Sequence, residues 1–258
     1  MADVRRDDLA SRDGLLDLLG LLAYAELVAF FRLCEDAALA PSLTDKAALG
    51  RMAVAEFSHF GRLGEQIEQL GADPDQVMRP FVAAVDAFHA RTAPSDWLEG
   101  LVKAYVGDGM AADFYRVIAD ALEPEPRALV LDVLADTGHA AFAVDRVRAA
   151  IAADPKLAGR LALWARRLVG EALGQAQRVA AEREPLAHLL TESIRLPGGK
   201  EAGGTSGRPA DDVADDVADD VDSQPAGETK SQLGELGRML ARLTDAHAQR
   251  MAALGLSS

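Results

Sequence analysis

Two short motifs, each an acid followed three residues later by a histidine, most constrain what this chain can fold into. They are Glu-Phe-Ser-His at 56–59 and Asp-Thr-Gly-His at 136–139, and a lone acid precedes each in an apolar stretch, Glu26 and Asp108 respectively. An acid and a histidine at this spacing share one helix face, so both can bind one metal ion. Two such helices and two single acids supply four carboxylates and two imidazoles. This is the ligand set of a two-metal centre in a four-helix bundle, and it suits iron or manganese.

The spacing of the four acids predicts that they lie at one height in the bundle. Glu26 and Glu56 are 30 residues apart and centre on the turn-rich sequence LAPSLTD, which should join two antiparallel helices. Asp108 and Asp136 are 28 residues apart and centre next to EPEP, where proline interrupts a helix. Each acid is therefore ~20 Å from its turn. The six predicted ligands are Glu26, Glu56, His59, Asp108, Asp136 and His139.

The apolar faces of the helices indicate which acids point inward. Asp108 shares its face with large apolar side chains, whereas the nearby Asp113 shares its face with charged residues. Asp132 lies one turn before Asp136, where it can be a hydrogen-bond partner for a ligating histidine. A bundle that binds no metal and keeps its acids protonated or hydrogen-bonded is the alternative. Burying ionised carboxylates without a cation costs several kcal/mol each, which favours the metal.

The composition predicts an all-α protein. The 258 residues are 49% hydrophobic and rich in helix-forming Ala, Leu, Glu and Arg. A single cysteine, Cys34, excludes an internal disulfide and a Cys-based metal site. No signal peptide opens the chain, and the most apolar run, residues 15–31, carries Asp17 and Glu26. We therefore expect a cytoplasmic protein that is not inserted in a membrane.

Turn and helix signals divide the chain into three parts. Residues 1–195 should form a bundle of two short hairpins joined by a long crossover, with a fifth helix added. Residues 196–231 contain the repeat ADDVADDVADDVD and should be a disordered acidic linker, either a solvated spacer or a contact surface for a basic partner. Residues 232–258 should form an amphipathic helix that docks on the bundle or pairs with another chain. The expected bundle helices span about 12–38, 44–70, from 95 onward, 125–152 and 155–190, with a short helix near 75–91 in the crossover.

Four segments within residues 13–190 resemble the MiaE-like branch of the ferritin-like superfamily. They are LLGLLAYAELVAFFRLCEDA, MAVAEFSHFGRL, DWLEGLVKAYVGDGMAADFYRVIA and VLADTGHAAFAVDRVRAAI. The resemblance implies a ferritin-like four-helix bundle whose six predicted ligands bind two iron ions. It also implies a monooxygenase that uses dioxygen and an external reductant to hydroxylate the isopentenyl group of a modified adenosine in tRNA.

The chain departs from that family at two ligand positions. The family pattern has Glu where this chain has Asp108 and Asp136, so the helices must approach more closely or the metals must shift toward the second hairpin. Gly107 and Gly109 flank Asp108, where they can allow close helix packing or leave room for substrate.

Charge argues against a broad nucleic-acid surface. Residues 1–195 hold 21 Lys and Arg against 30 Asp and Glu, a net charge of −9, whereas proteins that bind tRNA usually carry a basic surface. Arginines on such helices more often form a solvated surface than a phosphate site. The local group available for phosphate contacts is Arg146, Arg148, Lys156, Arg160, Arg166, Arg167, Arg178 and Arg183.

Three functions remain open from the sequence. The first is a di-iron hydroxylase or oxidase that acts on tRNA or another substrate, with dioxygen and a reductant as partners. The second is a ferritin-like protein for iron or oxidative-stress handling, and the third is a non-catalytic helical interaction protein. A homo-oligomer is compatible with each. Tyr105 and Tyr115 share a helix face with Asp108. They can donate a hydrogen bond or an electron to the metal centre, or pack in the core. His89, His188 and His247 lack partners at chelating spacing and receive no role.

Overall fold

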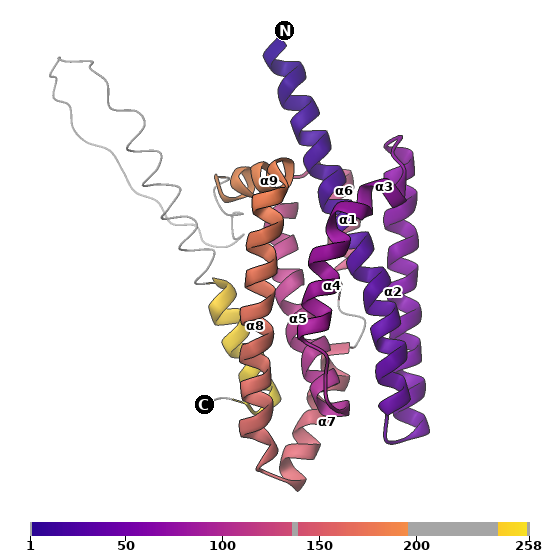
Figure 1. Cartoon of the computed structure of the whole chain (residues 1–258), viewed down its shortest axis with the longest axis vertical. Helices are drawn as coiled ribbons and strands as arrows, with labels where there is room; N and C mark the ends of the chain where they lie inside the picture. Colours follow the sequence, from indigo (N-terminus) through magenta and orange to yellow (C-terminus); the bar gives the residue numbers. More distant parts are fainter. Residues whose placement is uncertain (1, 136–138, 196–241, 257–258) are drawn as a thin grey trace, which may run out of the picture.

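The computed structural model describes residues 2–135, 139–195 and 242–256. Within these residues every regular element is a helix, and the long helices lie side by side in an elongated bundle (Figure 1). The all-α class predicted from the sequence is confirmed.

The first two helices form the expected hairpin. α1 (Ala2–Leu39) begins about ten residues earlier than predicted, whereas both ends of α2 (Leu43–Gln69) lie within one residue of the prediction. At the start of α2 the Ser42 side chain accepts a hydrogen bond from the Asp45 backbone N–H at 3.1 Å, which caps the helix. Beyond its end Gly71 has a φ of +75°, a conformation that residues with a Cβ rarely adopt.

A long crossover then carries the chain along the bundle to the next core helix. It contains α3 (Pro74–Met78), a 3-10 turn η1 (Arg79–Phe81) and α4 (Val82–Arg91), where the sequence predicted one short helix. α5 (Trp97–Ala119) follows, and the side chain of Asp96 caps it by accepting a hydrogen bond from a first-turn N–H at 3.0 Å.

The fourth helix is not continuous, which corrects the prediction of one helix from about 125 to 152. α6 (Pro124–Val133) ends before the second motif, and α7 (His139–Ala153) begins at its histidine. The residues between the two helices include Asp, Thr and Gly, which all have low helix propensity. Asp136 lies outside the described residues, so its place in the predicted ligand set stays a prediction.

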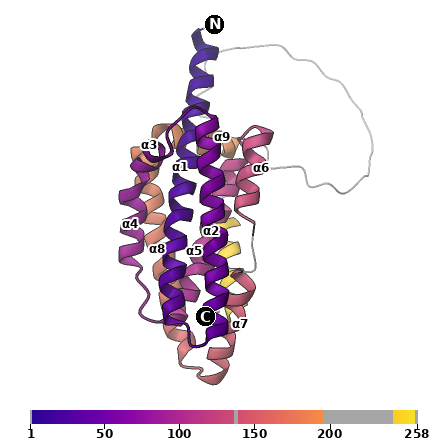
Figure 2. The same ribbon diagram turned by 90° about the vertical axis from the view of Figure 1, so that its right-hand side faces the viewer.

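The fifth helix is also divided, where one helix from about 155 to 190 was predicted. α8 (Leu157–Glu182) and α9 (Glu184–Arg195) are separated by Arg183, whose φ of −124° and ψ of 84° are not helical. Pro185 in the first turn of α9 has no N–H and cannot occupy a helix interior. The break leaves Arg183 free to form a two-point salt bridge with Asp17 of α1. In the side view α4 and α8 lie toward one edge of the bundle, and α6 and α7 toward the other (Figure 2).

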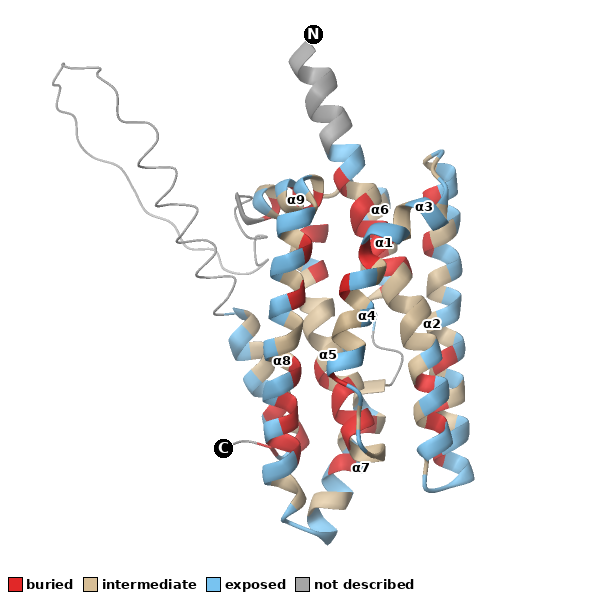
Figure 3. Ribbon diagram, in the orientation of Figure 1, coloured by how far each residue is buried: buried red, intermediate tan, exposed pale blue. Residues whose placement is uncertain are grey.

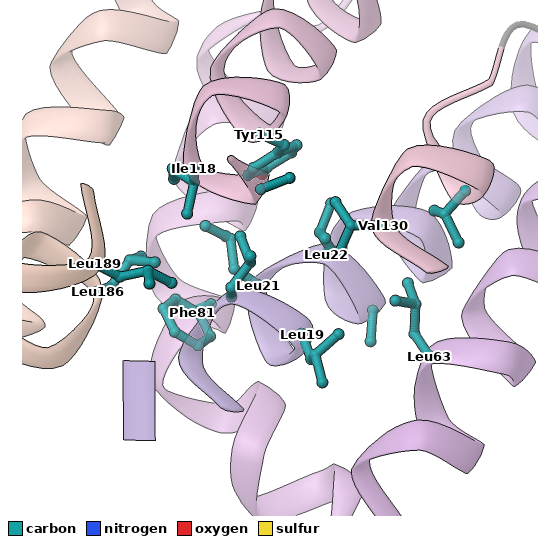
Figure 4. Packing of buried hydrophobic residues seen from close by; sticks show 14 of the residues in the cluster. Leu19, Leu21, Leu22, Leu63, Phe81, Tyr115, Ile118, Val130, Leu186 and Leu189 are labelled. Carbon is teal, nitrogen blue, oxygen red and sulfur yellow. The ribbon is translucent and has the colours of Figure 1, made fainter. Parts of the chain in front are cut away.

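Two separate apolar clusters fill the bundle, one toward each end. The first includes Leu19, Leu22, Leu63, Phe81, Ile118, Val130 and Leu189 (Figure 4). The second includes Leu33, Leu49, Leu101, Val106, Val147 and Leu161. Between them, residues 24–30 of α1 and most of residues 107–114 of α5 are partly buried, whereas residues 54–62 of α2 are partly buried or exposed (Figure 3). All the predicted ligands that the structure describes lie in or next to this middle layer.

Residues 242–256 dock on the bundle, one of the two arrangements expected for the C-terminal segment. Met251, Leu254 and Leu256 are buried in the second apolar cluster. Arg250 donates a hydrogen bond at 2.8 Å to the backbone oxygen of Gly109. A Cβ at this glycine would lie 2.3 Å from Nε of Arg250, so Gly109 serves close packing. The predicted linker, residues 196–231, lies outside the described residues, and the proposed division into domains stays a prediction.

One described helix segment, Ser11–Leu39, is long and apolar enough to cross a membrane by length and composition alone. Half of its most apolar window is buried inside the protein. Asp17 and Glu26 also lie within this segment and make contacts with other helices. These contacts are those of a core helix.

Candidate metal centre

Three of the predicted ligands meet in the middle layer between α1 and α2. Nδ1 of His59 lies 3.5 Å from Oε2 of Glu26 and 3.7 Å from Oε2 of Glu56. One ligand atom from each of these residues lies within 4.8 Å of the other two, a spacing that allows one metal ion to contact all three. Their side chains are only 12% or 13% exposed, so the group is shielded from bulk water.

His139 joins this group from the first residue of α7. Its Nδ1 lies 3.2 Å from Oε1 of Glu56, and its side chain is 17% exposed. The two oxygens of Glu56 therefore face different histidines, with Oε2 toward His59 and Oε1 toward His139. A carboxylate in this position can bridge two metal ions.

The charges in the group are strongly coupled. Burial raises the pKa of Glu26 to about 9, with His59 opposing the rise and Glu56 adding to it. Burial acts in the same direction on Glu56, but His59 and Glu26 outweigh it and lower the pKa of that carboxyl. The two carboxylates raise the pKa of His59 to about 9 against the effect of burial. A bound cation would compete with protons for these carboxylates and this imidazole.

Two atoms of the group also lack hydrogen bonds. Oε2 of Glu26 and Nδ1 of His59 are buried, and neither has a hydrogen-bond partner among the described residues. Their separation of 3.5 Å is too long for a good hydrogen bond. Buried polar atoms have hydrogen-bond partners in nearly all native structures, so the lack of partners here indicates a bound ligand such as a metal ion.

Asp108 of α5 faces the same layer but stands apart from the three clustered residues. Burial raises its pKa well above the usual range, the charge of Glu56 adds to the rise, and Lys103 opposes it. Protein atoms crowd the carboxyl, but Asp108 is an exposed residue that lines a cavity open to solvent. The structure thus brings together Glu26, Glu56, His59 and His139, with Asp108 within electrostatic range.

Comparison with protein families decides what this bundle is. A family model described as the ferritin-like domain of actinomycetes matches residues 10–193. The chain belongs to this ferritin-like family. The match spans the whole middle layer, from Glu26 to His139. No curated protein is a significant match to the chain.

A cavity of about 480 Å³ in this ferritin-like bundle is lined by one of the predicted ligands, Asp108, but not by Glu26, Glu56, His59 or His139. It is lined from α1, α4, α5, α8 and α9, largely by small and apolar side chains. Asp108 and Tyr115 of α5 connect it electrostatically with the centre. The charge of Glu56 contributes to the raised pKa of Asp108. Burial and the charge of Glu26 raise the pKa of Tyr115. An organic molecule in this cavity would lie beside Asp108.

Sequence reasoning gave His89 no role and did not single out the other polar residues that line this cavity, which are Arg32, Glu35, Asp36, Lys103 and Gln175. Nε of Arg32, Nδ1 of His89 and Oε1 of Gln175 are buried without hydrogen-bond partners among the described residues. Burial lowers the pKa of His89 to about 3, so this imidazole is neutral. One signal was available, because Lys103 is a single basic residue within an otherwise apolar stretch of α5, residues 101–106.

Other residues singled out in the sequence take structural roles in the ferritin-like bundle. Asp132 forms a salt bridge with Arg62 of α2 and not a contact with a ligating histidine. Tyr115 is 8% exposed and belongs to the first apolar cluster. Five of the eight basic side chains considered for phosphate contacts bind groups of this chain: Arg146, Arg148, Arg160, Arg167 and Arg183.

Proposed function

We propose that this ferritin-like protein is a di-iron oxidase or hydroxylase, related in chemistry to the MiaE-like proteins, that acts on an organic substrate. The observation that carries the proposal is the buried group formed by Glu26, Glu56 and His59, together with a cavity of about 480 Å³ that Asp108 lines. Manganese is compatible with the same donor set.

The residues present fit such a metal centre. Carboxylate oxygens and imidazole nitrogens are the ligands that di-iron bundles use, and two of these atoms are buried without hydrogen bonds. Glu26, Glu56, His59 and His139 would hold the metals with Asp108, and the sequence adds Asp136 as the sixth ligand. When bound, iron in such a site supplies oxidation chemistry with dioxygen and an external reductant.

The chain's own residues provide the surroundings that this chemistry needs. The two apolar clusters lie on either side of the middle layer, and the side chains of Glu26, Glu56 and His59 within it are only 12% or 13% exposed. Asp108 and Tyr115 stand where the centre and the cavity meet, so they can orient a substrate group or hold a proton beside it. The cavity gives an organic molecule a place beside Asp108, and a protein that only handles iron does not need such a place.

Transfer RNA is supported less well as the substrate. The bundle carries a net charge of −9, and five of the eight candidate phosphate-binding side chains already bind groups of this chain. Removing Arg166 together with Arg178, for which no intramolecular ion pair is seen among the described residues, should leave turnover of a small substrate intact. It should weaken tRNA binding if tRNA is the substrate.

Dioxygen consumption by the iron-loaded, chemically reduced protein tests the proposal. We expect uptake of dioxygen by the natural protein and its loss in His59→Ala. His188→Ala is the matched control, because His188 is exposed on α9. Iron-loaded protein that takes up no dioxygen after reduction would contradict the oxidase proposal and favour a storage role. Accumulation of unhydroxylated isopentenyl-adenosine in tRNA of a deletion strain would identify tRNA as the substrate.

A further inference from the structure

We propose that the cavity binds a long-chain monocarboxylate, with its carboxylate at Lys103 and its apolar chain running past Asp108. This inference rests on the proposed function in one respect only, that the bound chain would be the molecule oxidised at the metal centre. The binding site itself stands on separate observations of the cavity's shape, of its buried cation and of its unpartnered polar atoms.

The shape of the cavity suits an extended apolar chain. On α5 its lining runs from Gly100 to Tyr115, which corresponds to ~22 Å along the helix axis. Its volume of about 480 Å³ lies within the range of ligand sites, roughly 300–1,000 Å³. Much of the wall is built of small residues, at Ala25, Ala29, Ala104, Gly107, Ala111, Ala172 and Ala176.

Gly107 shows that part of this space is open at the centre of α5. A Cβ at Gly107 would meet no heavy atom within 4 Å, although the residue lines the cavity and precedes Asp108. Glycine in a helix interior costs roughly 0.5–1 kcal/mol relative to alanine. Packing against a neighbouring helix does not explain this glycine, in contrast to Gly109.

Lys103 supplies a buried cation in the cavity wall. It is 8% exposed, its Nζ donates a hydrogen bond to the Thr92 backbone oxygen at 2.8 Å, and Nζ lies 5.5 Å from the centre of the Phe88 ring. No carboxylate of the described residues forms a salt bridge with it. Burial and the charge of Arg32 lower its pKa to about 8, and the charges of Asp36, Asp108 and Glu35, which also line the cavity, oppose the fall. Because none of these carboxylates lies within salt-bridge distance of Nζ, a negatively charged ligand group can pair with the ammonium directly.

The neighbouring polar atoms favour an acceptor over a donor in the ligand. Nε of Arg32 is a donor and Nδ1 of His89 can be one, and both are buried without partners among the described residues. Glu35, the closest acid to the arginine, is already paired with it at 2.7 Å. Oε1 of Gln175 in the α8 wall, which is also unpartnered among the described residues, is an acceptor and is not satisfied by a carboxylate. A carboxylate satisfies the two donors and the ammonium, whereas a cationic or purely apolar ligand leaves them unsatisfied.

The position of the ligand along α5 follows from the helix geometry. Lys103 and Asp108 are five residues apart, ~7.5 Å along the axis. Both residues line the cavity, although they lie ~140° apart around the helix, so a carboxylate held at the lysine places the middle of an extended chain at the level of Asp108. The apolar end of the chain then reaches Phe114, Val179 and Leu186, which line the far part of the cavity.

Titration calorimetry with dodecanoate and with dodecanol tests the proposal on the full-length protein. The natural protein should bind dodecanoate about tenfold or more tightly than the alcohol, because only the acid pairs with the buried ammonium. Lys103→Met should remove this preference while keeping alcohol binding, and Lys46→Met, at an exposed lysine, should retain it. A natural protein that binds both ligands equally, or a Lys103→Met variant that retains the preference, would overturn the anion site.

Two further variants locate the site and separate it from the metal centre. Gly107→Leu should fill the cavity and abolish dodecanoate binding, whereas Gly61→Leu, at an open exposed position of α2, should not. His59→Ala should lose metal and still bind dodecanoate. Binding that survives Gly107→Leu, in a variant with unchanged helical circular dichroism, would refute the cavity as the site. If dodecanoate binds but no metal does, the ligand site stands without the proposed function, and the reverse result leaves only the metal centre.

Discussion

A buried lysine that forms no salt bridge with the described residues should cost this protein stability, so Lys103→Met should stabilise it at neutral pH. The pKa of Lys103 is lowered from 10.5 to about 8. At about 1.4 kcal/mol for each pKa unit, the charged form costs about 3 kcal/mol. Methionine removes this cost but leaves the Thr92 carbonyl without its hydrogen bond, a loss of about 1–2 kcal/mol. The free energy of unfolding should therefore rise by about 1–2 kcal/mol at pH 7.

The pH dependence gives this prediction a second, independent signature. Between pH 8 and pH 10.5 the unfolded chain still holds the lysine proton that the folded chain has lost. The stability of the natural protein relative to the variant consequently rises with pH across this window. The advantage of Lys103→Met should be complete below pH 8 and absent by about pH 10.

Urea unfolding followed by helical circular dichroism at pH 7 and pH 10 measures both effects. Lys46→Met, at an exposed lysine of α2, should change stability by less than ~0.5 kcal/mol at either pH. A Lys103→Met variant that is less stable than the natural protein at pH 7, or whose advantage persists unchanged at pH 10, would show that the ammonium is well solvated or paired.

Two further predictions concern how the helices pack. Gly20→Ala should lower the free energy of unfolding by about 1–3 kcal/mol, because its Cβ would lie 2.5 Å from the Val77 backbone oxygen. Gly64→Ala, in open space on α2, should instead stabilise by up to ~1 kcal/mol, and equal effects in urea unfolding would refute the close approach. Arg183→Met leaves Asp17, 4% exposed, without its partner. Because the arginine side is 34% exposed, we expect a loss of about 2–3 kcal/mol by thermal unfolding, and an unchanged midpoint would contradict a stabilising pair.

The sequence predicted the first hairpin and the middle layer well, for physical reasons. The helix boundaries near Ser42 and Gly71 follow from local capping and turn chemistry, which a single chain segment determines. Equal spacing of Glu26 and Glu56 about their turn fixed their common height, and the structure places them together with His59. Their role as metal ligands stays a prediction.

Features that depend on distant contacts were not predictable in the same way. The helix breaks after Val133 and at Arg183 interrupt apolar patterns that read as continuous, and the second break is stabilised by a partner more than 160 residues away in the chain. The cavity could not be predicted from the sequence, because it forms where small residues of several helices face one another. Gly107 and Gly109 look equivalent in sequence, yet one faces open space and the other accommodates Arg250.

Direct metal analysis tests the central claim most simply. The natural protein, loaded with ferrous iron under anaerobic conditions and freed of excess metal, should retain about two iron ions per chain. His59→Ala should lose most of this metal, because His59 faces both Glu26 and Glu56. His188→Ala should retain it, because His188 is exposed on α9. Full retention of iron in His59→Ala, or no iron in the natural protein, would contradict a metal centre at this position.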